Sequence, residues 1–308
     1  MINYFFNKLN IIIRLKTVNN LPYLVNVPPF IIRDLKEEDL RLIKKIYLIF
    51  FGKFIGYIVK RTKGKTFCFL INIFFKKNGK IIYKDEKYIK EINKERVAYY
   101  PNKRILRIVK SLDYQLSLLF NSYCLEKIDF KDEDIVIDCG ANVGELGLSF
   151  INKGLNLNYL AFEPDTKTYD CLVLNIGNDK NKTYNLGLSN QNSKKEFFLD
   201  NDGGNSSLVN FGSDKSAEIE TITLDSLELS SQIKLFKVEA EGYEPEVLKG
   251  SKNTLGLIEY VSVDFGPERG IELENTVVEV NNLLVESNFE LIEFSKFRMI
   301  GLYKNKEL

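Results

Sequence analysis

The chain has 308 residues, of which 44% are hydrophobic and 28% are charged, a composition typical of a soluble globular protein with one large domain and an extension. It contains no histidine, which excludes Ser-His and Cys-His nucleophile systems, histidine-ligated metals and the usual general base. Carboxylates, Lys, Tyr or Cys must therefore carry out any proton transfer. The four cysteines are far apart and have no C-x-x-C spacing, so they predict neither a zinc site nor a disulfide framework. Their pattern favours a reducing cytoplasm.

Charge is divided unevenly along the chain. Residues 1–110 contain 25 Lys and Arg against 8 Asp and Glu, whereas residues 111–308 contain 18 against 34. The basic N-terminal third is expected to meet something anionic. A phospholipid surface, an acidic glycan and the acidic part of the same chain all stay open as partners. A nucleic acid is disfavoured, because charge alone supports it and no base-reading motif accompanies the basic region.

Residues 1–100 are interpreted as a mostly helical accessory region, rich in Ile, Phe, Tyr and Lys. Within it, Leu40–Arg61 has the pattern of an amphipathic helix that lies on a surface, either a membrane or the catalytic domain. Charged residues interrupt every apolar run before the roughly 18–20 residues that span a bilayer. Met1–Lys16 also makes a poor signal peptide, since its charges follow its apolar stretch. The expected location is the cytoplasm, with peripheral contact to the inner face of the membrane as an open possibility.

From residue 101 to the end, the chain is predicted to form a second domain. A helical segment over Ile105–Tyr123 precedes short apolar strands that alternate with helical stretches, the pattern of parallel βαβ units. This order predicts an α/β fold, a doubly wound sheet with an antiparallel hairpin at one edge. Helices are expected after the first two strands and around Pro245–Ser251 and Leu273–Ser287. The expected strands are Ile135–Asp138, Tyr159–Glu163, Lys182–Leu188, Glu218–Thr223, Leu235–Glu239, Tyr260–Asp264 and a final pair, Phe289–Glu293 with Arg298–Tyr303.

The strongest functional signal is the loop after the first of these strands, where Asp138, Gly140, Asn142, Gly144 and Glu145 follow in the form D-x-G-x-x-x-G. The glycines permit a tight turn and a helix start close to the strand, so that a ligand approaches backbone N–H groups. The position that a dinucleotide fingerprint gives to its second glycine is occupied by Asn142, which favours a cofactor without a phosphate. An ordinary tight turn is the alternative.

The second strand of the pattern ends in Phe162-Glu163-Pro164. Glu163 lies 19 residues after Gly144, near the roughly 20-residue spacing at which an acidic side chain reaches ribose hydroxyls. We therefore expect a carboxylate–diol contact from Glu163. Strand, loop, helix and terminal Glu in this register predict a nucleotide-cofactor pocket.

These residues resemble the FkbM-type S-adenosylmethionine-dependent methyltransferases. The resemblance covers roughly residues 120–300 and implies a class I, Rossmann-like methyltransferase domain that uses S-adenosyl-L-methionine. It further implies transfer of a methyl group to an oxygen, often a hydroxyl of a sugar, glycan or related small molecule. The motifs that carry it are Val136–Glu145, Phe162–Pro164, Leu188–Ser189, Ser206–Leu208, Thr223–Leu227 and Lys237–Gly250.

Methyl transfer requires alignment of an acceptor oxygen with the S–CH₃ bond and removal of its proton. Without histidine, Glu241 and Glu239 are the predicted bases, and Lys237 is a candidate ion-pair partner at the same strand end. Glu239 departs from the family pattern, which usually has Asp at its position, and this puts its catalytic role in doubt. A plain charged turn before the next helix explains the same residues.

Three further residues are predicted to bind the acceptor. Asp264 and Arg269 belong to a charged, glycine-rich turn after a strand, and Ser206 belongs to a polar loop over Asn201–Ser207 that is able to close over the site. A salt-bridged surface turn and a plain surface loop are the alternatives. A carboxylate-bound Mg²⁺ is the weaker idea, and no metal is predicted.

Two rival functions stay open at the level of sequence. The first is a nucleotide-dependent oxidoreductase on a similar sheet, against which the loop spacing and Asn142 speak. The second is a non-catalytic module on the same fold, associated with a membrane or a glycan, which the basic N-terminal third and the altered Glu239 favour. The methyl acceptor, its regiochemistry and the oligomeric state do not follow from the sequence.

Overall fold

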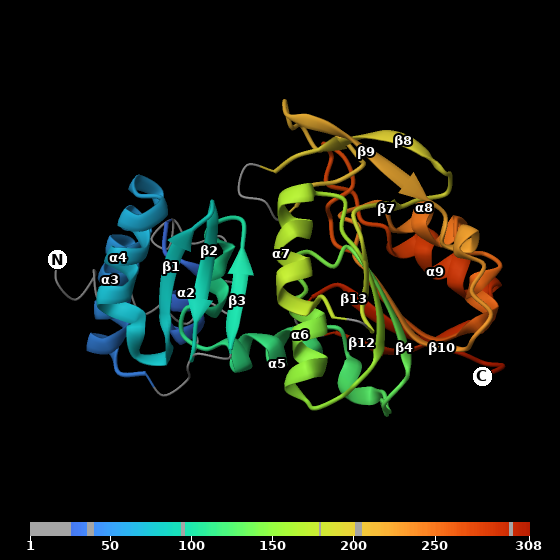
Figure 1. Cartoon of the computed structure of the whole chain (residues 1–308), viewed down its shortest axis with the longest axis horizontal. Helices are drawn as coiled ribbons and strands as arrows, with labels where there is room; N and C mark the ends of the chain where they lie inside the picture. Colours follow the sequence, from blue (N-terminus) through green and yellow to red (C-terminus); the bar gives the residue numbers. More distant parts are fainter. Residues whose placement is uncertain (1–25, 36–39, 94–95, 179, 201–204, 296–297) are drawn as a thin grey trace. The chain divides into compact units, whose positions relative to one another are not determined.

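The computed structural model describes residues 26–308 except 36–39, 94–95, 179, 201–204 and 296–297. Its chain divides into two compact units. One comprises residues 1–97 and 105–111, and the other comprises residues 98–104 and 112–308 (Figure 1). Among the described residues, no helix is long and apolar enough to cross a membrane.

The first unit is built around two helices and a β-hairpin. Its elements are α2 (Pro29–Leu35), α3 (Leu42–Arg61), α4 (Gly64–Phe75), the 3-10 helix η3 (Lys76–Asn78), β1 (Lys80–Lys84) and β2 (Lys87–Glu91). The expected helix over 40–61 is present as α3. The hairpin was not predicted; Asp85 and Glu86 form its two-residue turn with φ of 48° and 57°, the left-handed conformation that such tight turns need.

Aromatic and aliphatic side chains fill the core of the first unit, and one buried lysine is held among them. Phe67 and Ile71 of α4 are fully buried. Lys90 of β2 is also fully buried, and its ammonium group donates to the carbonyl oxygens of Gly79 and Val109 at 3.0 and 2.9 Å. Burial lowers the pKa of Lys90 to about 8, because the charged form loses its hydration.

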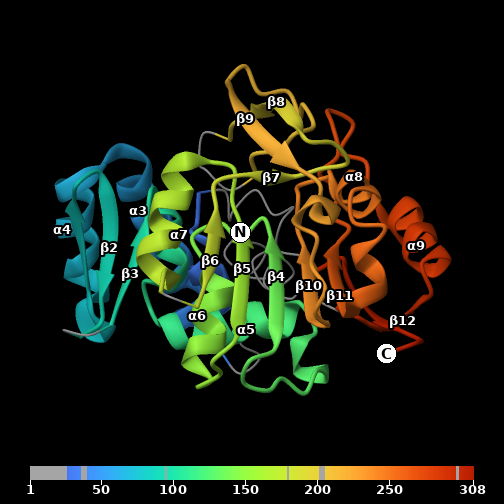
Figure 2. The ribbon, with the colours of Figure 1, turned by 45° about the vertical axis from the view of Figure 1, so that its right-hand side comes forward.

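A mixed seven-stranded sheet forms the centre of the second unit (Figure 2), in the order β12-β13-β11-β10-β4-β5-β6. The five strands from β11 to β6 are parallel, and β12 and β13 are antiparallel at one edge. The prediction of a doubly wound α/β sheet with an antiparallel edge hairpin is therefore confirmed. The strands are β4 (Ile135–Cys139), β5 (Asn158–Phe162), β6 (Lys182–Tyr184), β10 (Ile233–Val238), β11 (Ile258–Asp264), β12 (Phe289–Phe294) and β13 (Ile300–Asn305).

Helices cover both faces of this sheet. Successive residues of a strand point to opposite faces, so Val136 and Ile137 of β4 belong to different apolar clusters. Val136 packs in the cluster that includes residues of α5, α6 and α7, and Ile137 packs in the cluster that includes residues of α8 and α9. The helices are α5 (Leu112–Ser122), α6 (Glu145–Asn152), α7 (Thr166–Ile176), α8 (Glu244–Lys249) and α9 (Val277–Glu286).

Several predicted elements are divided or displaced. The helix expected over 105–123 consists of a 3-10 helix, η4 (Lys103–Ile108), and α5. The strand expected over 182–188 ends at Tyr184, because the Asn185 side chain donates to the carbonyls of Glu163 and Pro164 and the chain leaves the sheet there. The continuation belongs to a separate small sheet, ordered β7-β9-β8. Its strands are β7 (Gly187–Leu188), β8 (Ser193–Phe198), which was not predicted, and β9 (Ser216–Ile222).

The remaining short elements are β3 (Val97–Tyr100), a strand of the sheet ordered β1-β2-β3, and the 3-10 helices η5 (Leu125–Lys127), η6 (Leu224–Leu227) and η7 (Thr254–Leu257). Thr223 caps η6 itself, whereas Asp225 accepts the backbone N–H groups of Asn253 and Thr254 at the start of η7. Asp225 thus joins two turns that are far apart in the sequence.

Candidate active site

The predicted cofactor loop follows the carboxyl end of β4. Asp138 is fully buried there; one carboxylate oxygen accepts the Tyr159 hydroxyl, and the other lies 2.9 Å from the Lys237 ammonium group. Gly140 has a φ of 73°, and a Cβ at this position would lie 1.9 Å from the carbonyl oxygen of Glu239. The loops after β4 and β10 therefore approach each other so closely that only glycine fits at residue 140.

The backbone N–H groups of residues 140–144 are all used within the protein, which differs from the expectation that a ligand meets free N–H groups here. In chain order, Gly140 and Ala141 donate to Phe162 O, Asn142 to Glu163 Oε2, Val143 to Asn142 Oδ1, and Gly144 to Ala141 O, at 2.9 to 3.1 Å. A phosphate binds through such groups. Residues 140–144 consequently have no free donor for a phosphate, and the loop suits a cofactor that lacks one.

The other predicted cofactor residues of this loop shape the turn and the start of α6. Asn142 has a φ of 49°, and its side chain caps the next residue instead of pointing away from the loop. Gly144, with a φ of 83°, is the N-cap of α6. Glu145 is buried in the first turn of α6, where it accepts the Tyr100 hydroxyl at 2.6 Å.

Glu163 lies just beyond the end of β5 and is buried against the loop. Its Oε2 accepts the backbone N–H of Asn142 and its Oε1 accepts that of Asp165, both at 2.9 Å. Burial raises the pKa of Glu163 to about 7, because removal from water penalises the carboxylate more than the two N–H donors compensate. A carboxylate oxygen accepts two hydrogen bonds. Each oxygen of Glu163 therefore keeps one lone pair for a ligand.

Lys237, near the end of β10, is a buried cation that joins four groups. Its ammonium group lies 2.9 Å from Asp138 Oδ1 and 3.3 Å from Glu239 Oε2, and it donates to the carbonyls of Cys139 and Gly140 at 3.0 and 2.8 Å. Burial alone would lower the pKa of Lys237, but the neighbouring Asp138 carboxylate raises it well above the ordinary value. With its donors used by these groups, Lys237 holds the cofactor loop against the end of β10.

Glu239 is surrounded by two cationic side chains and a tyrosine hydroxyl. Its Oε2 accepts the Tyr123 hydroxyl, and its Oε1 pairs with the Arg298 guanidinium. Burial opposes ionisation, but the charges of Arg298 and Lys237 outweigh it and hold the pKa of Glu239 far below its usual range. A carboxylate with such a low pKa is a weak proton acceptor. This environment makes Glu239 a poorer candidate base than Glu241.

Arg298 and Tyr123 belong to this site, although the sequence reasoning did not select them. Arg298 pairs with Asp264 as well as with Glu239, and so connects the ends of β10 and β11. A signal for Arg298 existed. An antiparallel strand begins at the edge where its parallel neighbours end, and Arg298 stands just before β13. Tyr123 follows α5, and nothing in its local sequence indicated a contact with β10.

Glu241 occupies a tightly constrained turn after β10. Its backbone has a φ of 51°, in the left-handed region that costs a non-glycine residue of order 1 kcal/mol or more. The Ser207 hydroxyl donates to its carbonyl oxygen at 2.8 Å. Glu244, buried at the start of α8, accepts the N–H groups of Ala240 and Gly242 at 2.9 and 3.0 Å. Contacts on both sides of Glu241 therefore hold the strained turn in place.

The side chain of Glu241 lies beside another carboxyl group, that of Glu268, which sequence reasoning also missed. Burial, and then the charges of Glu239 and Glu268, raise the pKa of Glu241 to about 10. Burial and the Asp264 charge likewise raise the pKa of Glu268. Two adjoining carboxyls share a proton, since both cannot ionise at close range. Oε2 of Glu241 is buried and accepts no hydrogen bond from an N–H or hydroxyl group of the described residues, which leaves Glu268 as the neighbour of this carboxyl.

The predicted acceptor residues are differently placed. Asp264 is buried at the end of β11, where it accepts the N–H of Gly266 at 2.9 Å and pairs with Arg298. Arg269 makes a two-pronged ion pair with Glu246, at 2.9 and 2.7 Å, which is the arrangement of a salt-bridged turn.

The polar loop that was expected to close over the site is only partly described. The Ser206 hydroxyl accepts the N–H of Asp200 at 2.9 Å, and it is the next residue, Ser207, that contacts the Glu241 turn. Residues 201–204 of the same loop lie outside the described residues. Among the described residues, no group of three or more Cys, Asp or Glu side chains is arranged to hold a metal ion.

The parallel sheet, the loop after β4 and the acidic residue after β5 together define an α/β class I methyltransferase fold. Residues 138–291 match the family model described as the methyltransferase FkbM domain. This is half of the chain, and the protein belongs to the FkbM methyltransferase family. Membership brings S-adenosylmethionine as the methyl donor.

Two curated relatives are also methyltransferases. A hexuronic acid methyltransferase, AglP, of Haloferax volcanii is 30% identical over 139 residues, which are 44% of this chain and 56% of the relative. The methyltransferase sdnD of Sordaria araneosa is 25% identical over 239 residues, 65% of this chain and 88% of the relative. The chain thus spans little more than half the length of the first relative. A solved S-adenosylmethionine-dependent methyltransferase from Aquifex aeolicus is 12% identical with a TM-score of 0.37, over 62% of this chain and 97% of that one.

Proposed function

We propose that this protein transfers the methyl group of S-adenosylmethionine to a hydroxyl oxygen of a sugar, a glycan or a related metabolite, with Glu241 as the general base. The observation that carries the proposal is the Glu241 carboxyl at the carboxyl edge of the sheet, buried at Oε2, held by a strained turn and placed beside the Glu268 carboxyl. Ligands of doubly wound sheets bind at this edge. The relative named as a hexuronic acid methyltransferase supports a sugar as the acceptor.

In this proposal the cofactor lies along the loop after β4. Glu163 accepts the two ribose hydroxyls with the lone pairs that its backbone contacts leave open. Asp138 and Lys237 support the loop from the interior of the protein, since both side chains are buried and form an ion pair with each other. They position Gly140 and its neighbours and do not touch the reacting atoms. The used N–H groups of residues 140–144 support a cofactor without a pyrophosphate, and so argue against an oxidoreductase that binds a dinucleotide.

S-adenosylmethionine supplies a methyl carbon on a sulfonium sulfur, so that displacement by the acceptor oxygen releases a neutral thioether. The protein aligns the acceptor and takes its proton. The ionised form of Glu241 receives that proton, which the Glu241–Glu268 pair then shares. Glu239, kept ionised by Arg298 and Lys237, offsets part of the charge of these two cations near the cationic cofactor.

Among the residues expected to bind the acceptor, we place Asp264 beside it, because Asp264 ends β11 and pairs with Arg298, which also pairs with Glu239. Arg269 acts through its ion pair with Glu246, which holds the turn after β11 against α8. Ser206 is proposed to help position the acceptor indirectly, through the next residue, Ser207, which contacts the Glu241 turn. The acceptor hydroxyl is therefore proposed to lie between the Glu241–Glu268 pair and the end of β11.

Calorimetric titration with S-adenosylmethionine tests the cofactor half of the proposal. The full chain is expected to bind it, and the Glu163→Ala variant is expected to bind far more weakly. No binding by the full chain would refute this half. Undiminished binding by the variant would remove Glu163 from the site.

A product assay tests the base. Mass spectrometry of a pool of hexuronic acids and other sugars should show a gain of one methyl group. Glu241→Gln is expected to retain S-adenosylmethionine binding and to lower turnover by about 10²- to 10⁴-fold, the usual contribution of a general base. The exposed Glu220→Gln, on β9, is the matched control and should turn over normally. Wild-type turnover by Glu241→Gln would refute the role of Glu241. Cofactor binding without any methylated product would favour a non-catalytic module.

The pH profile separates a base from a merely structural carboxylate. Because the pKa of Glu241 is raised to about 10, the rate should increase with pH through the alkaline range as Glu241 ionises. Glu268→Gln removes a negative neighbour, which lowers the pKa of Glu241 and moves this increase to lower pH. Glu241→Gln should abolish the increase. A profile that neither variant alters would contradict the assignment.

A further inference from the structure

Helix α3 carries a continuous stripe of exposed, bulky apolar side chains. Ile43, Tyr47, Phe50, Phe54 and Tyr57 are between 50 and 83% exposed. Their spacing of four, three, four and three residues places all five on one face of the helix. Monomeric soluble proteins seldom expose a contiguous apolar face of this kind without a function.

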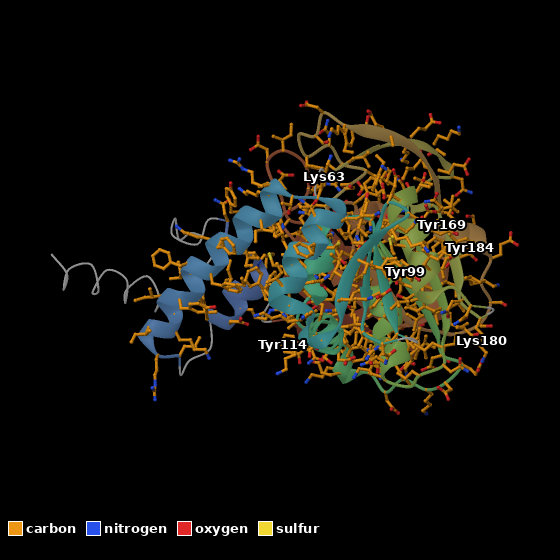
Figure 3. The ribbon with its side chains drawn as sticks, turned by 60° about the vertical axis from the view of Figure 1, so that its left-hand side comes forward. Lys63, Tyr99, Tyr114, Tyr169, Lys180 and Tyr184 are labelled. Atoms are coloured by element: carbon orange, nitrogen blue, oxygen red, sulfur yellow. The ribbon has the colours of Figure 1, made fainter. Side chains whose placement is uncertain are left out.

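The stripe continues onto α4. The ring of Phe74 packs edge-on against Phe54 at a centroid distance of 5.8 Å, and both rings stay substantially exposed. Phe69 and Ile73, on the same helix, are 68 and 56% exposed. We call these eight residues of the two helices the α3–α4 apolar face. Figure 3 turns both helices toward the viewer, with Lys63 labelled at the turn that joins them.

The opposite sides of the two helices are occupied by the core of the unit. Ile55 of α3 and Phe67 and Ile71 of α4 are fully buried. The packing that α3 needs for its own stability is therefore supplied by residues other than those of the exposed face. An apolar surface that folding does not require is available to a partner.

The segment that contains α3 and α4 is basic. Residues 41–84 include 12 Lys and Arg and no Asp or Glu. Lys53 and Lys60 are exposed, and each lies three residues after a member of the stripe, Phe50 or Tyr57. The Arg61 guanidinium lies over the Tyr57 ring, 5.2 Å from its centroid. A bulky apolar stripe with a basic border is the composition of a helix that lies in a membrane interface. Such a border attracts anionic lipid headgroups.

We propose that the α3–α4 apolar face binds the surface of an anionic lipid bilayer, with α3 and α4 lying in the plane of the interface. Ile43 and Ile73 favour a bilayer over a nucleic acid. Aliphatic side chains are stabilised by burial among acyl chains, whereas stacking on nucleic-acid bases requires aromatic rings or arginine. The charge of residues 41–84 commits the surface to anionic lipid. The inference is independent of the acceptor and of the chemistry proposed for Glu241.

Vesicle flotation with the full chain tests the proposal. Vesicles of neutral phosphatidylcholine are compared with vesicles that contain phosphatidylglycerol. The protein should float with the anionic vesicles and bind the neutral ones at least about tenfold more weakly, since each basic residue near an anionic surface contributes roughly fivefold. Equal binding to both vesicles, or binding to neither, would overturn the proposal.

Three double variants identify the surface. Phe50→Ser with Phe54→Ser should reduce partition by more than about tenfold through lost apolar contact. Lys53→Gln with Lys60→Gln should reduce it by about 25-fold, from two charges at the fivefold contribution of each. Ile271→Ser with Val278→Ser is the control, because these side chains are 72 and 71% exposed elsewhere in the chain, and it should leave partition unchanged.

Circular dichroism of each variant verifies that the fold is intact, which is expected because every substituted side chain is exposed. A control variant that loses as much binding as the Phe variant would overturn the assignment to the α3–α4 apolar face. A parallel titration with duplex DNA covers the competing macromolecule. Tight DNA binding that depends on the lysines and ignores the Phe substitutions, together with weak flotation, would assign the surface to nucleic acid instead.

Discussion

Substitution of Lys237 by Met should unfold the protein at a markedly lower denaturant concentration. The side chains of Lys237 and Asp138, which form an ion pair, are 3% and 1% exposed. Removal of one partner of a buried ion pair typically costs about 3–5 kcal/mol, because the other charge is left buried and unpaired. The two carbonyl groups of Cys139 and Gly140 lose their donor as well.

The size of this loss is measurable by urea denaturation followed by circular dichroism. A domain has a free energy of unfolding of about 5–15 kcal/mol, so the substitution removes a large part of it. With a denaturant slope of about 3 kcal/mol per molar, the midpoint of unfolding should decrease by about 1 to 2 M.

The exposed pair between Lys194 and Glu218 provides a matched control. Its nitrogen and oxygen are also 2.9 Å apart, but the two side chains are 63 and 66% exposed. Lys194→Met should leave the midpoint unchanged, because water and salt screen an exposed pair. The double variant of Lys237→Met with Asp138→Asn should recover part of the stability, since no unpaired charge remains. A midpoint for Lys237→Met equal to that of Lys194→Met would refute the reasoning.

Three further outcomes are expected. Because burial raises the pKa of Glu163 to about 7, its carboxyl is protonated below that pH and accepts ribose hydroxyls poorly. Calorimetry should therefore show affinity for S-adenosylmethionine falling as the pH falls through 7, and Glu163→Gln should lose this dependence. Gly140→Ala should abolish cofactor binding and lower the melting temperature, since its Cβ would lie 1.9 Å from a carbonyl oxygen. Gly154 also has a positive φ, but a Cβ there would have no atom within 4 Å, so Gly154→Ala should lower the free energy of unfolding by only about 1–2 kcal/mol. Equal melting temperatures for the two glycine variants would contradict this. Arg298→Gln should raise the pKa of Glu239 by removing a cation, which an NMR titration of the Glu239 carboxyl measures; an unchanged pKa would show that Arg298 does not keep Glu239 ionised.

Much of the second unit could be predicted because its signals are local. Strand β4 is a run of apolar residues that ends in a glycine turn, and the predicted strand over 135–138 differs from it by one residue. The order of strands and helices was sufficient to predict the parallel sheet and its antiparallel edge. The edge at which the site lies followed from the same order, since parallel strands all end on one side.

Predictions failed where a distant contact decides the local structure. The strand expected over 182–188 is broken because the Asn185 side chain binds two carbonyls some twenty residues earlier. The hairpin of β1 and β2 was missed because its turn, Asp85-Glu86, lacks the glycine or asparagine that usually marks such a turn. The ion pair of Arg269 with Glu246, 23 residues earlier, also could not be inferred locally, and the acceptor-binding role of Arg269 stays a prediction.

By itself, the sequence determined the fold class, the family and the cofactor loop, because these depend on patterns within a few residues and on their order. Only the tertiary structure decided in which direction the pKa of each carboxyl shifts. Glu239 and Glu241 are two residues apart on one strand end and look equivalent in the sequence. Arg298 and Lys237 lower the pKa of Glu239, whereas burial and the neighbouring acids raise that of Glu241. The ionisation of a side chain depends on the charges and the water around it, and folding brings those charges from β4, β10, β11 and the start of β13.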